Sequence, residues 1–255
     1  MFTIKSQSEI EKMKKAGEIL YEALQLIKKN TVPGVTTKEL DRIAEEYIKK
    51  NHATPSFKGY DVGIPGMAPF PGSICASVNE EVVHGIPSLK PLKDGDIISI
   101  DVGVHLNGYH ADAARTFSVG NINTEAQRLI DETRQSFFEG LKQMVIGNHI
   151  RDISEAIQNH VESKGFSVVR DFVGHGIGKD LHEMPDIPNY VTKRRGPRLE
   201  AGMTIAVEPM VNAGSYSVKV LENRWTVVTT DKSLSAHYEN TVAITNNEPI
   251  ILTRF

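Results

Sequence analysis

The chain has 255 residues, with 29 Lys and Arg against 32 Asp and Glu, which gives a formal net charge of −3. Hydrophobic residues make up 40% and charged residues 24%, which excludes global disorder because disordered chains combine low hydrophobicity with high net charge. Without a basic excess, a dedicated nucleic-acid binder is not indicated, and we expect no DNA partner. The single cysteine, Cys75, cannot form an intrachain disulfide, which favours a reducing, cytoplasmic location. No apolar run is long enough for a membrane span, and charges follow the N-terminus too early for an export signal.

Two amphipathic helices are predicted before residue 50. Apolar residues recur at steps of three and four over residues 8–29, and Pro33 with Gly34 then interrupts the chain. Thr36, with Glu39 three residues later, has the pattern of a capping box and starts a second helix. A loop rich in Pro and Gly is expected next, up to about residue 72.

Strands and two more helices are predicted in the remainder of the chain. The helices are expected over residues 124–146 and around residues 153–161, the second ending near Gly165. Strands are expected at the apolar runs 74–83, 96–104, 111–119, 166–173, 203–209, 217–221, 225–230 and 237–245.

An internal repeat relates two halves, about 8–120 and 124–250, of what we expect to be one catalytic domain over residues 1–255. At an offset of 107, Asp101 and the apolar run before it match Glu208 and its run. At an offset of 127, Asp112 matches Glu239. A longer second hairpin accounts for the difference between the offsets. The simplest interpretation is an α+β fold made of a duplicated helix–helix–sheet unit with a pseudo-twofold axis, where the four carboxylates converge.

These four acidic residues are the first candidates for a functional site. Any one of them could be a strand-end acid that pairs with an arginine. Four in corresponding positions indicate a metal site instead, because a buried carboxylate without a partner costs several kcal/mol. Sites rich in oxygen ligands suit divalent cations, and several carboxylates with one imidazole can hold two of them.

Three histidines are candidates for the imidazole ligand or for catalysis. His175 is flanked by glycines in the segment 174–178, and we expect these glycines to let the backbone approach a metal or substrate. The segment lacks the G-x-G-x-x-G pattern of a dinucleotide-binding loop. His84 and His182 neighbour Gly or Pro turns, where functional side chains are often presented, although a lone histidine can also be structural.

The ordered set Asp101, Asp112, His175, Glu208 and Glu239 resembles the five-ligand dinuclear metal site of the methionine aminopeptidase family. The segments 78–87, 174–178, 208–210 and 238–241 carry the same resemblance, which spans essentially the whole chain. Glu239 follows Glu208 by only 31 positions, which leaves no room for the helical insertion of type II enzymes, so the chain resembles type I. The resemblance implies the pita-bread fold of creatinases and aminopeptidases, with a central curved antiparallel sheet.

The same resemblance implies a role for each ligand. Asp101 would bind one of two divalent metal ions through both oxygens, Asp112 and Glu239 would bridge the two ions, and His175 and Glu208 would complete the other. Co, Mn, Fe and Zn all suit such a site, so the metal identity stays open. Hydroxide activated by the ions would attack the first peptide bond of a chain that begins with methionine.

Catalytic and substrate-binding residues are also implied by the resemblance. Glu208 would move the proton, His182 would donate to the developing oxyanion, and His84 would lie beside the scissile amide. Family members prefer a small second residue. His84 and His182 would also contact substrate, and the methionine pocket would be completed by Tyr60, Phe70, Cys75, Leu181 and Trp225.

The chain departs from the family pattern in this pocket. Its loop over residues 60–70 is longer than in compact bacterial members. Phe57 or a neighbour stands where a pocket cysteine is often found, and Leu181 occupies a position that is frequently aromatic. Cys75 fits equally well as a small buried hydrophobe, and Trp225 as a core residue.

Three functions are compatible with these observations. The first is removal of the initiator methionine from nascent proteins. The second is a related exopeptidase that cuts before proline, although the short region before Asp101 lacks the N-terminal domain usual in such enzymes. The third is a non-catalytic binding module. Relatives of that kind lose metal ligands, whereas all five candidate ligands are present in this sequence. A basic loop at residues 193–198 could contact the ribosome or be a solvated loop, and we expect a monomer.

Overall fold

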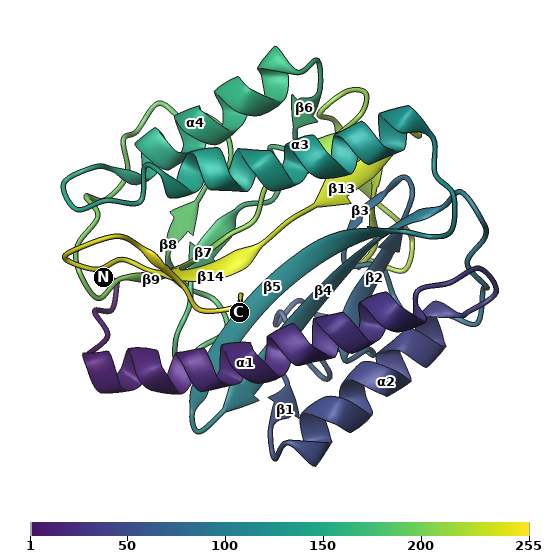
Figure 1. The fold of residues 1–255 in the computed structure, drawn as a ribbon, viewed down its shortest axis with the longest axis horizontal. Coiled ribbons are helices and arrows are strands. Elements are labelled where there is room, and N and C mark those ends of the chain that lie inside the picture. The colour runs from purple at the N-terminus through teal and green to yellow at the C-terminus, as the bar shows by residue number, and fades with distance from the viewer. Residues whose placement is uncertain (1, 255) are drawn as a thin grey trace.

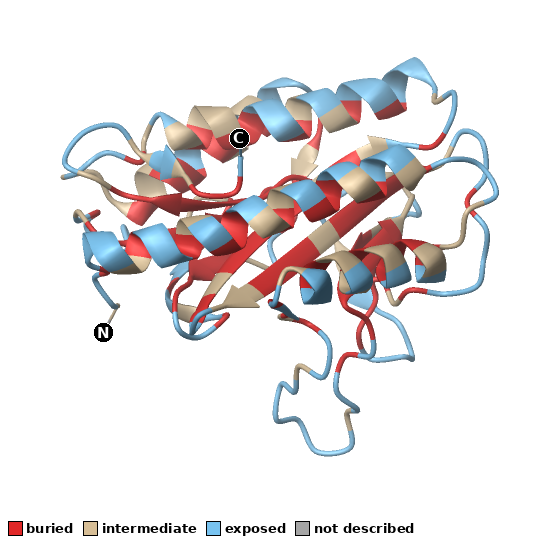
Figure 2. Ribbon diagram, turned by 60° about the horizontal axis from the view of Figure 1, so that its bottom comes forward, coloured by how far each residue is buried: buried red, intermediate tan, exposed pale blue. Residues whose placement is uncertain are grey.

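The structure is a computed structural model that describes residues 2–254, and two helix pairs flank its strands (Figure 1). The first pair is α1 (Gln7–Asn30) with α2 (Thr37–Lys50), and the second is α3 (Thr124–Leu141) with α4 (Ile150–Ser163). Each helix turns an apolar face towards the strands and a polar face outwards (Figure 2). Helix packing in each half therefore follows from the period of the apolar residues.

The helix starts are set by short-range hydrogen bonds. Ser6 and Glu9 form a complete capping box at the start of α1. The box predicted for α2 is only half formed: Thr36 accepts from the backbone N–H of Glu39, whereas the Glu39 carboxylate pairs with Arg42 at 2.5 Å. Either arrangement satisfies an N-terminal N–H that would otherwise lack a partner.

The first half is centred on a long hairpin. Strands β4 (Ile97–Leu106) and β5 (Tyr109–Ser118) pair antiparallel along their whole length. Strand β2 (Ile74–Val78) and the short β1 (Thr54–Pro55) also pair antiparallel with β4. The apolar residues of these strands pack with α1 and α2 in one core cluster.

The second half carries a corresponding hairpin that is broken into short strands. Strand β9 (Thr204–Val207) pairs with β14 (Asn240–Ala243), and β10 (Met210–Asn212) pairs with β13 (Ser235–His237). These strands pack with α3 and α4 in a second core cluster. The remaining strands are β3 (Glu81–Val83), β6 (Ser167–Val168), β7 (Gly174–Gly176), β8 (Glu183–Ile187), β11 (Val218–Val220), β12 (Val227–Thr229) and β15 (Ile250–Ile251).

The two halves meet where β5 lies beside β13 and β14 (Figure 1). The backbone N–H of Asp112 donates to Thr241 Oγ1 at 2.9 Å, and the backbone N–H of Glu239 donates to the Ala114 carbonyl at 3.0 Å. The offset of 127 that relates Asp112 to Glu239 also relates Ala114 to Thr241, so the two contacts are equivalent under the repeat. Asp112 and Glu239 therefore lie at the junction of the halves.

Several predicted elements differ in the structure. The helix predicted over 124–146 ends at Leu141, because the next N–H groups form tighter turn bonds such as Gln143 to the Gly140 carbonyl. The segment 74–83 divides into β2 and β3 at Asn79, which has φ of 57°. The strand predicted over 166–173 is only two residues long, and β1, β7, β8, β10 and β15 were not predicted.

Candidate active site

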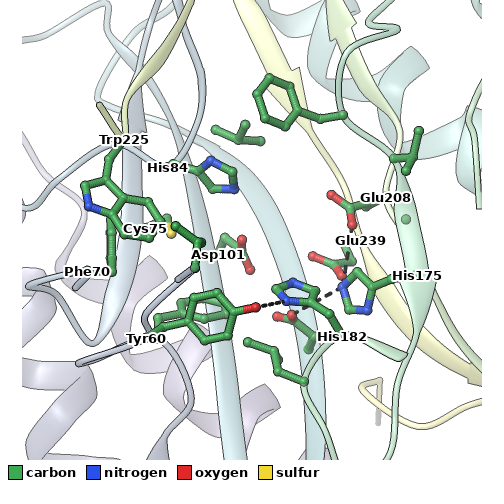
Figure 3. Close-up of a pocket in the computed structure, with 18 of the residues that line it drawn as sticks. Tyr60, Phe70, Cys75, His84, Asp101, His175, His182, Glu208, Trp225 and Glu239 are labelled. Carbon is green, nitrogen blue, oxygen red and sulfur yellow. Dashed lines mark hydrogen bonds and ion pairs between the residues drawn. The ribbon is translucent and has the colours of Figure 1, made fainter. Parts of the chain in front are cut away.

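One cavity of about 360 Å³ opens between the two halves of the chain (Figure 3). The structure brings every candidate residue from the sequence into its lining. The lining includes Tyr60, Phe70, Cys75, His84, Asp101, Asp112, His175, Leu181, His182, Glu208, Trp225 and Glu239. We call Asp101, Asp112, His175, Glu208 and Glu239 the cavity floor. We call Tyr60, Val62 and His182 the cavity rim.

Strand pairing positions the carboxylates of the floor. Asp101 lies in β4 and Asp112 in β5, within the long hairpin. In the second half, the register between β9 and β14 continues unchanged between β10 and β13, which sets Glu208 across from Glu239. Because sheet register fixes where each side chain leaves the backbone, the four carboxylates converge on the cavity, where the side chains of Asp101 and Asp112 hydrogen-bond to each other.

The floor side chains lie close enough for a shared cation. Asp112, His175 and Glu239 each offer one ligand atom, and these atoms all lie within 4.8 Å of one another. His175 Nε2 is 3.7 Å from Glu208 Oε1 and 4.0 Å from Asp112 Oδ2. Asp101 lines the same cavity, although it is not within this group of three.

Burial raises the pKa values of all four floor carboxylates, and repulsion from neighbouring carboxylates adds to the rise for Asp101, Asp112 and Glu239. Desolvation raises the pKa of Glu208 to about 8 and that of Asp101 to about 6. The pKa values of Asp112 and Glu239 lie well above their usual range, first through desolvation and then through the neighbouring carboxylates. The nearby Arg115 donates to the backbone carbonyl of Glu239 and not to a floor carboxylate.

The donor atoms of the floor suit a divalent cation. Asp101 Oδ1, Asp112 Oδ1 and Glu239 Oε1 are buried and have no hydrogen-bond partner. No Lys or Arg within residues 2–254 forms an ion pair with any floor carboxylate. Buried carboxylates in this state need a counter-charge, and a mainly oxygen donor set with one imidazole suits a divalent metal ion.

The His175 ring is neutral and is oriented so that it can bind a metal ion. Its Nδ1 donates to the Gly176 carbonyl at 2.8 Å, which leaves the Nε2 lone pair facing the carboxylates. Burial lowers the pKa of His175 to about 3, so the ring stays neutral at physiological pH. A ligating histidine must be neutral and is commonly oriented by such a bond from its other nitrogen.

The glycines beside His175 are required by packing. A Cβ at Gly174 would lie 2.3 Å from the Ala206 carbonyl oxygen, and one at Gly176 would lie 2.3 Å from the Met184 carbonyl oxygen. Only glycine therefore fits at these two positions of β7, which pairs with β8 on one side and β9 on the other.

The rim is more exposed and is held by contacts between side chains. Tyr60 Oη lies 2.6 Å from His182 Nδ1, and the two rings meet edge to face. His182 also lies over His175, with ring centroids 4.3 Å apart. Val62, in the loop that follows Tyr60, is 40% exposed beside them. His182 therefore reaches the floor from a loop rather than from a sheet strand.

The opposite wall of the cavity is apolar. Phe70 and Trp225 meet edge to face with centroids 5.1 Å apart, and Trp225 Nε1 donates to the Ala68 carbonyl at 3.0 Å. Burial raises the pKa of the Cys75 thiol, which therefore stays neutral. Cys75 and Trp225 belong to a buried apolar cluster and also line the cavity.

His84 lies on this wall in a left-handed backbone conformation, with φ of 59°. Its ring faces Phe172 at 5.5 Å and Trp225 at 6.3 Å between centroids. Burial lowers the pKa of His84 to about 4, so the ring is neutral near pH 7. Phe172 was not among the candidates, because its position in a predicted strand did not distinguish it from a core residue.

His237 is the main residue that the candidate list lacked. Its Nε2 is 3.6 Å from Glu208 Oε2 and 3.9 Å from Glu239 Oε2. The sequence carried one signal for it, because His237 matches His110 at the same offset of 127 that matches Glu239 to Asp112, but a pair of strand histidines does not by itself indicate a site.

The basic loop 193–198 does not line this cavity and forms part of a second surface hollow, together with residues of α4 and β8; Asp186 lines both hollows. Among residues 2–254, none of the helices combines the length and the apolar character that crossing a membrane requires.

Comparisons with known proteins agree with this geometry. The family model for metallopeptidase family M24 matches residues 11–246. The methionine aminopeptidase of Clostridium perfringens is 58% identical over 253 residues, which are 99% of this chain and 99% of that protein. The crystal structure of methionine aminopeptidase from Thermotoga maritima has a TM-score of 0.95 to this chain at 45% identity, and the match covers 100% of both chains.

A prolidase has the same fold at greater distance. The prolidase structure from Pyrococcus horikoshii has a TM-score of 0.79 at 23% identity, and the match covers 98% of this chain and 63% of the prolidase chain. At that identity the likeness concerns the fold alone. Together with the matches above, it confirms the predicted α+β pita-bread fold.

Proposed function

The chain belongs to metallopeptidase family M24, and from this premise we propose that it is a methionine aminopeptidase of type I. It would remove the initiator methionine from nascent proteins and peptides in the cytoplasm. The observation that carries the proposal is the cavity floor, where buried carboxylates without a cationic partner adjoin an apolar wall. We take residues 1–255, with halves at about 8–120 and 124–250, as one catalytic domain that acts as a monomer.

Five residues would hold the metal ions. We assign two divalent ions to Asp101, Asp112, His175, Glu208 and Glu239, with Asp112 and Glu239 shared because they lie at the junction of the halves. Co, Mn, Fe and Zn remain candidates, since carboxylate and imidazole donors accept all of them. When bound, such ions lower the pKa of water and polarise a carbonyl group, which makes a nucleophile available at neutral pH.

The chain's own side chains supply proton transfer and hydrogen bonds. Glu208 lies beside His175 on the floor, and its high pKa suits a carboxyl group that takes up and releases a proton near neutral pH. His182 Nδ1 can accept from the Tyr60 hydroxyl, which leaves Nε2–H free to donate to the oxyanion that develops on the carbonyl oxygen. His84, neutral and next to the apolar wall, would contact the scissile amide.

The apolar wall would receive the methionine side chain. Phe70, Cys75, Leu181 and Trp225 are buried, apolar and next to the floor, with Tyr60 at the edge of the same space. A thioether makes favourable contacts with aromatic rings, which suits the Phe70–Trp225 pair. The rim would then lie over the second residue of the substrate, which favours a small one.

A peptide assay with controlled metal tests this function. The protein is stripped with a chelator, and Met-Ala-Ser, Met-Leu-Ser and Ala-Pro-Ser are each incubated with Mn²⁺, Co²⁺, Fe²⁺ or Zn²⁺. Metal-dependent release of methionine, faster from Met-Ala-Ser than from Met-Leu-Ser, is expected. Cleavage of Ala-Pro-Ser alone would replace the proposal with the proline-specific exopeptidase. No cleavage with any metal would favour the binding module.

Contact with the ribosome through the basic loop 193–198 remains a separate part of the proposal. The positive charge of Lys193, Arg194, Arg195 and Arg198 would favour encounter with ribosomal RNA, and such binding should weaken steeply with salt. Sedimentation with ribosomes at two salt concentrations tests it without reference to peptidase activity.

A further inference from the structure

His237 lies directly behind the cavity floor at the end of β13. Its exposed fraction is 1%, and it does not line the cavity itself. Its backbone is fixed on β5, because its N–H donates to Thr116 Oγ1 at 2.8 Å and Thr116 Oγ1 donates back to its carbonyl at 2.9 Å. The position of its ring is therefore set by the junction of the two halves.

The ring nitrogen Nε2 points at the floor carboxylates. It lies 3.6 Å from Glu208 Oε2 and 3.9 Å from Glu239 Oε2, is buried, and has no hydrogen-bond partner. The other Glu208 oxygen, Oε1, lies 3.7 Å from His175 Nε2. The Glu208 carboxylate thus stands between two imidazoles, one on the cavity floor and one behind it.

The proton on the His237 ring belongs on Nε2. A lone pair on that nitrogen would face two carboxylate oxygens and repel both, whereas an N–H at the same place would be attracted to both. A neutral imidazole can carry its proton on either nitrogen, so an N–H at Nε2 requires no change in the charge of the ring. Small movements of Glu208 would bring the 3.6 Å separation into hydrogen-bond range.

The repeat-related position in the other half lacks this arrangement. His110 corresponds to His237 at the offset of 127. The His110 ring lies 2.9 Å from Ser56 Oγ through Nδ1 and stacks on His105, with centroids 4.4 Å apart. A histidine at this strand position therefore has no general need to face carboxylates, and the contact of His237 is particular to the Glu208 side of the site.

We propose that His237 is a positioning residue that donates from Nε2–H to Glu208 and fixes the orientation of that carboxylate for metal binding. The proposal rests on the proposed function, in which Glu208 is a metal ligand and moves the proton. A residue of this kind contacts a metal ligand but not the metal itself. Its loss typically lowers metal affinity or activity by about 10- to 100-fold.

The test compares three variants of the full chain with the wild type. His237→Gln keeps an N–H donor on a neutral side chain, His237→Leu removes the donor at similar volume, and His110→Leu is the matched control in the other half. Co²⁺ binding is measured without substrate, by calorimetry and by the visible absorption spectrum of the bound ion. Thermal unfolding of each metal-free variant reports whether it folds.

We expect Co²⁺ affinity to fall about 10- to 100-fold in His237→Leu, with an altered Co²⁺ spectrum, and to stay within about threefold of wild type in His237→Gln and His110→Leu. If folded His237→Leu bound Co²⁺ with wild-type affinity and spectrum, the inference would fail while the proposed function stood. If His237→Gln, although folded, lost affinity as far as His237→Leu, donation to Glu208 would not be the role of His237. A wild-type protein that binds no Co²⁺ would overturn the inference and the metal site together.

Discussion

The cavity floor and the cavity rim differ in what positions their side chains. Floor residues such as Asp112, on β5, and Glu239, in the short break between β13 and β14, are positioned by strand pairing, are buried, and keep oxygen atoms without hydrogen-bond partners. Rim residues such as Tyr60 and His182 stand on loops, reach solvent, and bond to each other. The sheet can thus hold charges in place that repel one another, whereas the loops position side chains only through mutual contacts.

This difference has an energetic consequence. Buried carboxylates without partners destabilise the folded chain, and only the surrounding core clusters offset that cost. Side chains of the rim can be exchanged at little cost to folding, because they are exposed. Substitutions on the floor should therefore change activity and stability in opposite directions, while those on the rim should change activity alone.

The largest expected effect is on the floor. Asp112→Ala removes a carboxylate at the junction of the halves, and we expect a larger loss of peptidase activity than the 10²- to 10³-fold that loss of one hydrogen-bond donor causes. Methionine release from Met-Ala-Ser at saturating metal measures it. Asp152→Ala, on α4 away from the cavity, serves as the control. Unchanged activity of Asp112→Ala would contradict the assignment of the floor as the metal site.

The next largest effect belongs to the rim. His182→Ala removes a proposed oxyanion donor but leaves the floor intact, so kcat should fall about 10²- to 10³-fold while Co²⁺ affinity stays near that of the wild type. Steady-state kinetics and metal titration separate the two quantities. Loss of metal binding in this variant would mean that rim and floor are not independent.

Removal of metal should reveal the pH dependence of stability that the floor carboxylates cause. Asp101 and Glu208 have folded-state pKa values of about 6 and about 8, above those of the unfolded chain, so above about pH 4 the folded state holds more protons on them than the unfolded state does. Below about pH 6.5 buried histidines act in the opposite sense, because His84 and His175 have folded-state pKa values of about 4 and about 3. Stability of the metal-free protein should therefore fall as the pH rises from about 6.5 to 8, and we expect a decrease in Tm of about 5 °C over this range.

Two comparisons sharpen this pH experiment. Asp112→Asn removes one of the interacting charges and should flatten the dependence of Tm on pH in the metal-free protein. Added divalent metal should raise Tm most at the alkaline end, where the carboxylates are ionised and bind it best. A Tm that rises between about pH 6.5 and 8 in the metal-free wild type would contradict the raised pKa of Glu208.

Sequence predicted the floor better than the rim for a physical reason. An acidic residue at the end of an apolar strand is unusual, because charged side chains are seldom buried. The repeat places such a residue at matching positions in both halves, as with Asp101 and Glu208. Strand register is also regular, so positions along a strand translate directly into space. Fold class and helix positions followed from the same periodic patterns.

The parts that sequence did not predict depend on contacts between distant segments. Strand β8 pairs with β7, and neither has the apolar alternation of a half-buried strand. The hydrogen bond between Tyr60 and His182 joins residues 122 positions apart and depends on the path of two loops. The repeat matches His237 to His110, and only the distance to Glu208 distinguishes the surroundings of the two histidines.

The smallest expected effect tests whether the rim needs its internal contacts at all. Tyr60→Phe keeps the ring against His182 but removes the hydroxyl that lies 2.6 Å from Nδ1. A hydrogen bond near solvent contributes about 0.5–1.5 kcal/mol, so kcat/KM should fall only about 2- to 10-fold, with metal affinity and Tm unchanged. Tyr47→Phe on α2 controls for loss of a phenol elsewhere. If Tyr60→Phe instead matched His182→Ala, the orientation of His182 would depend on this single bond, and the rim would be as rigidly built as the floor.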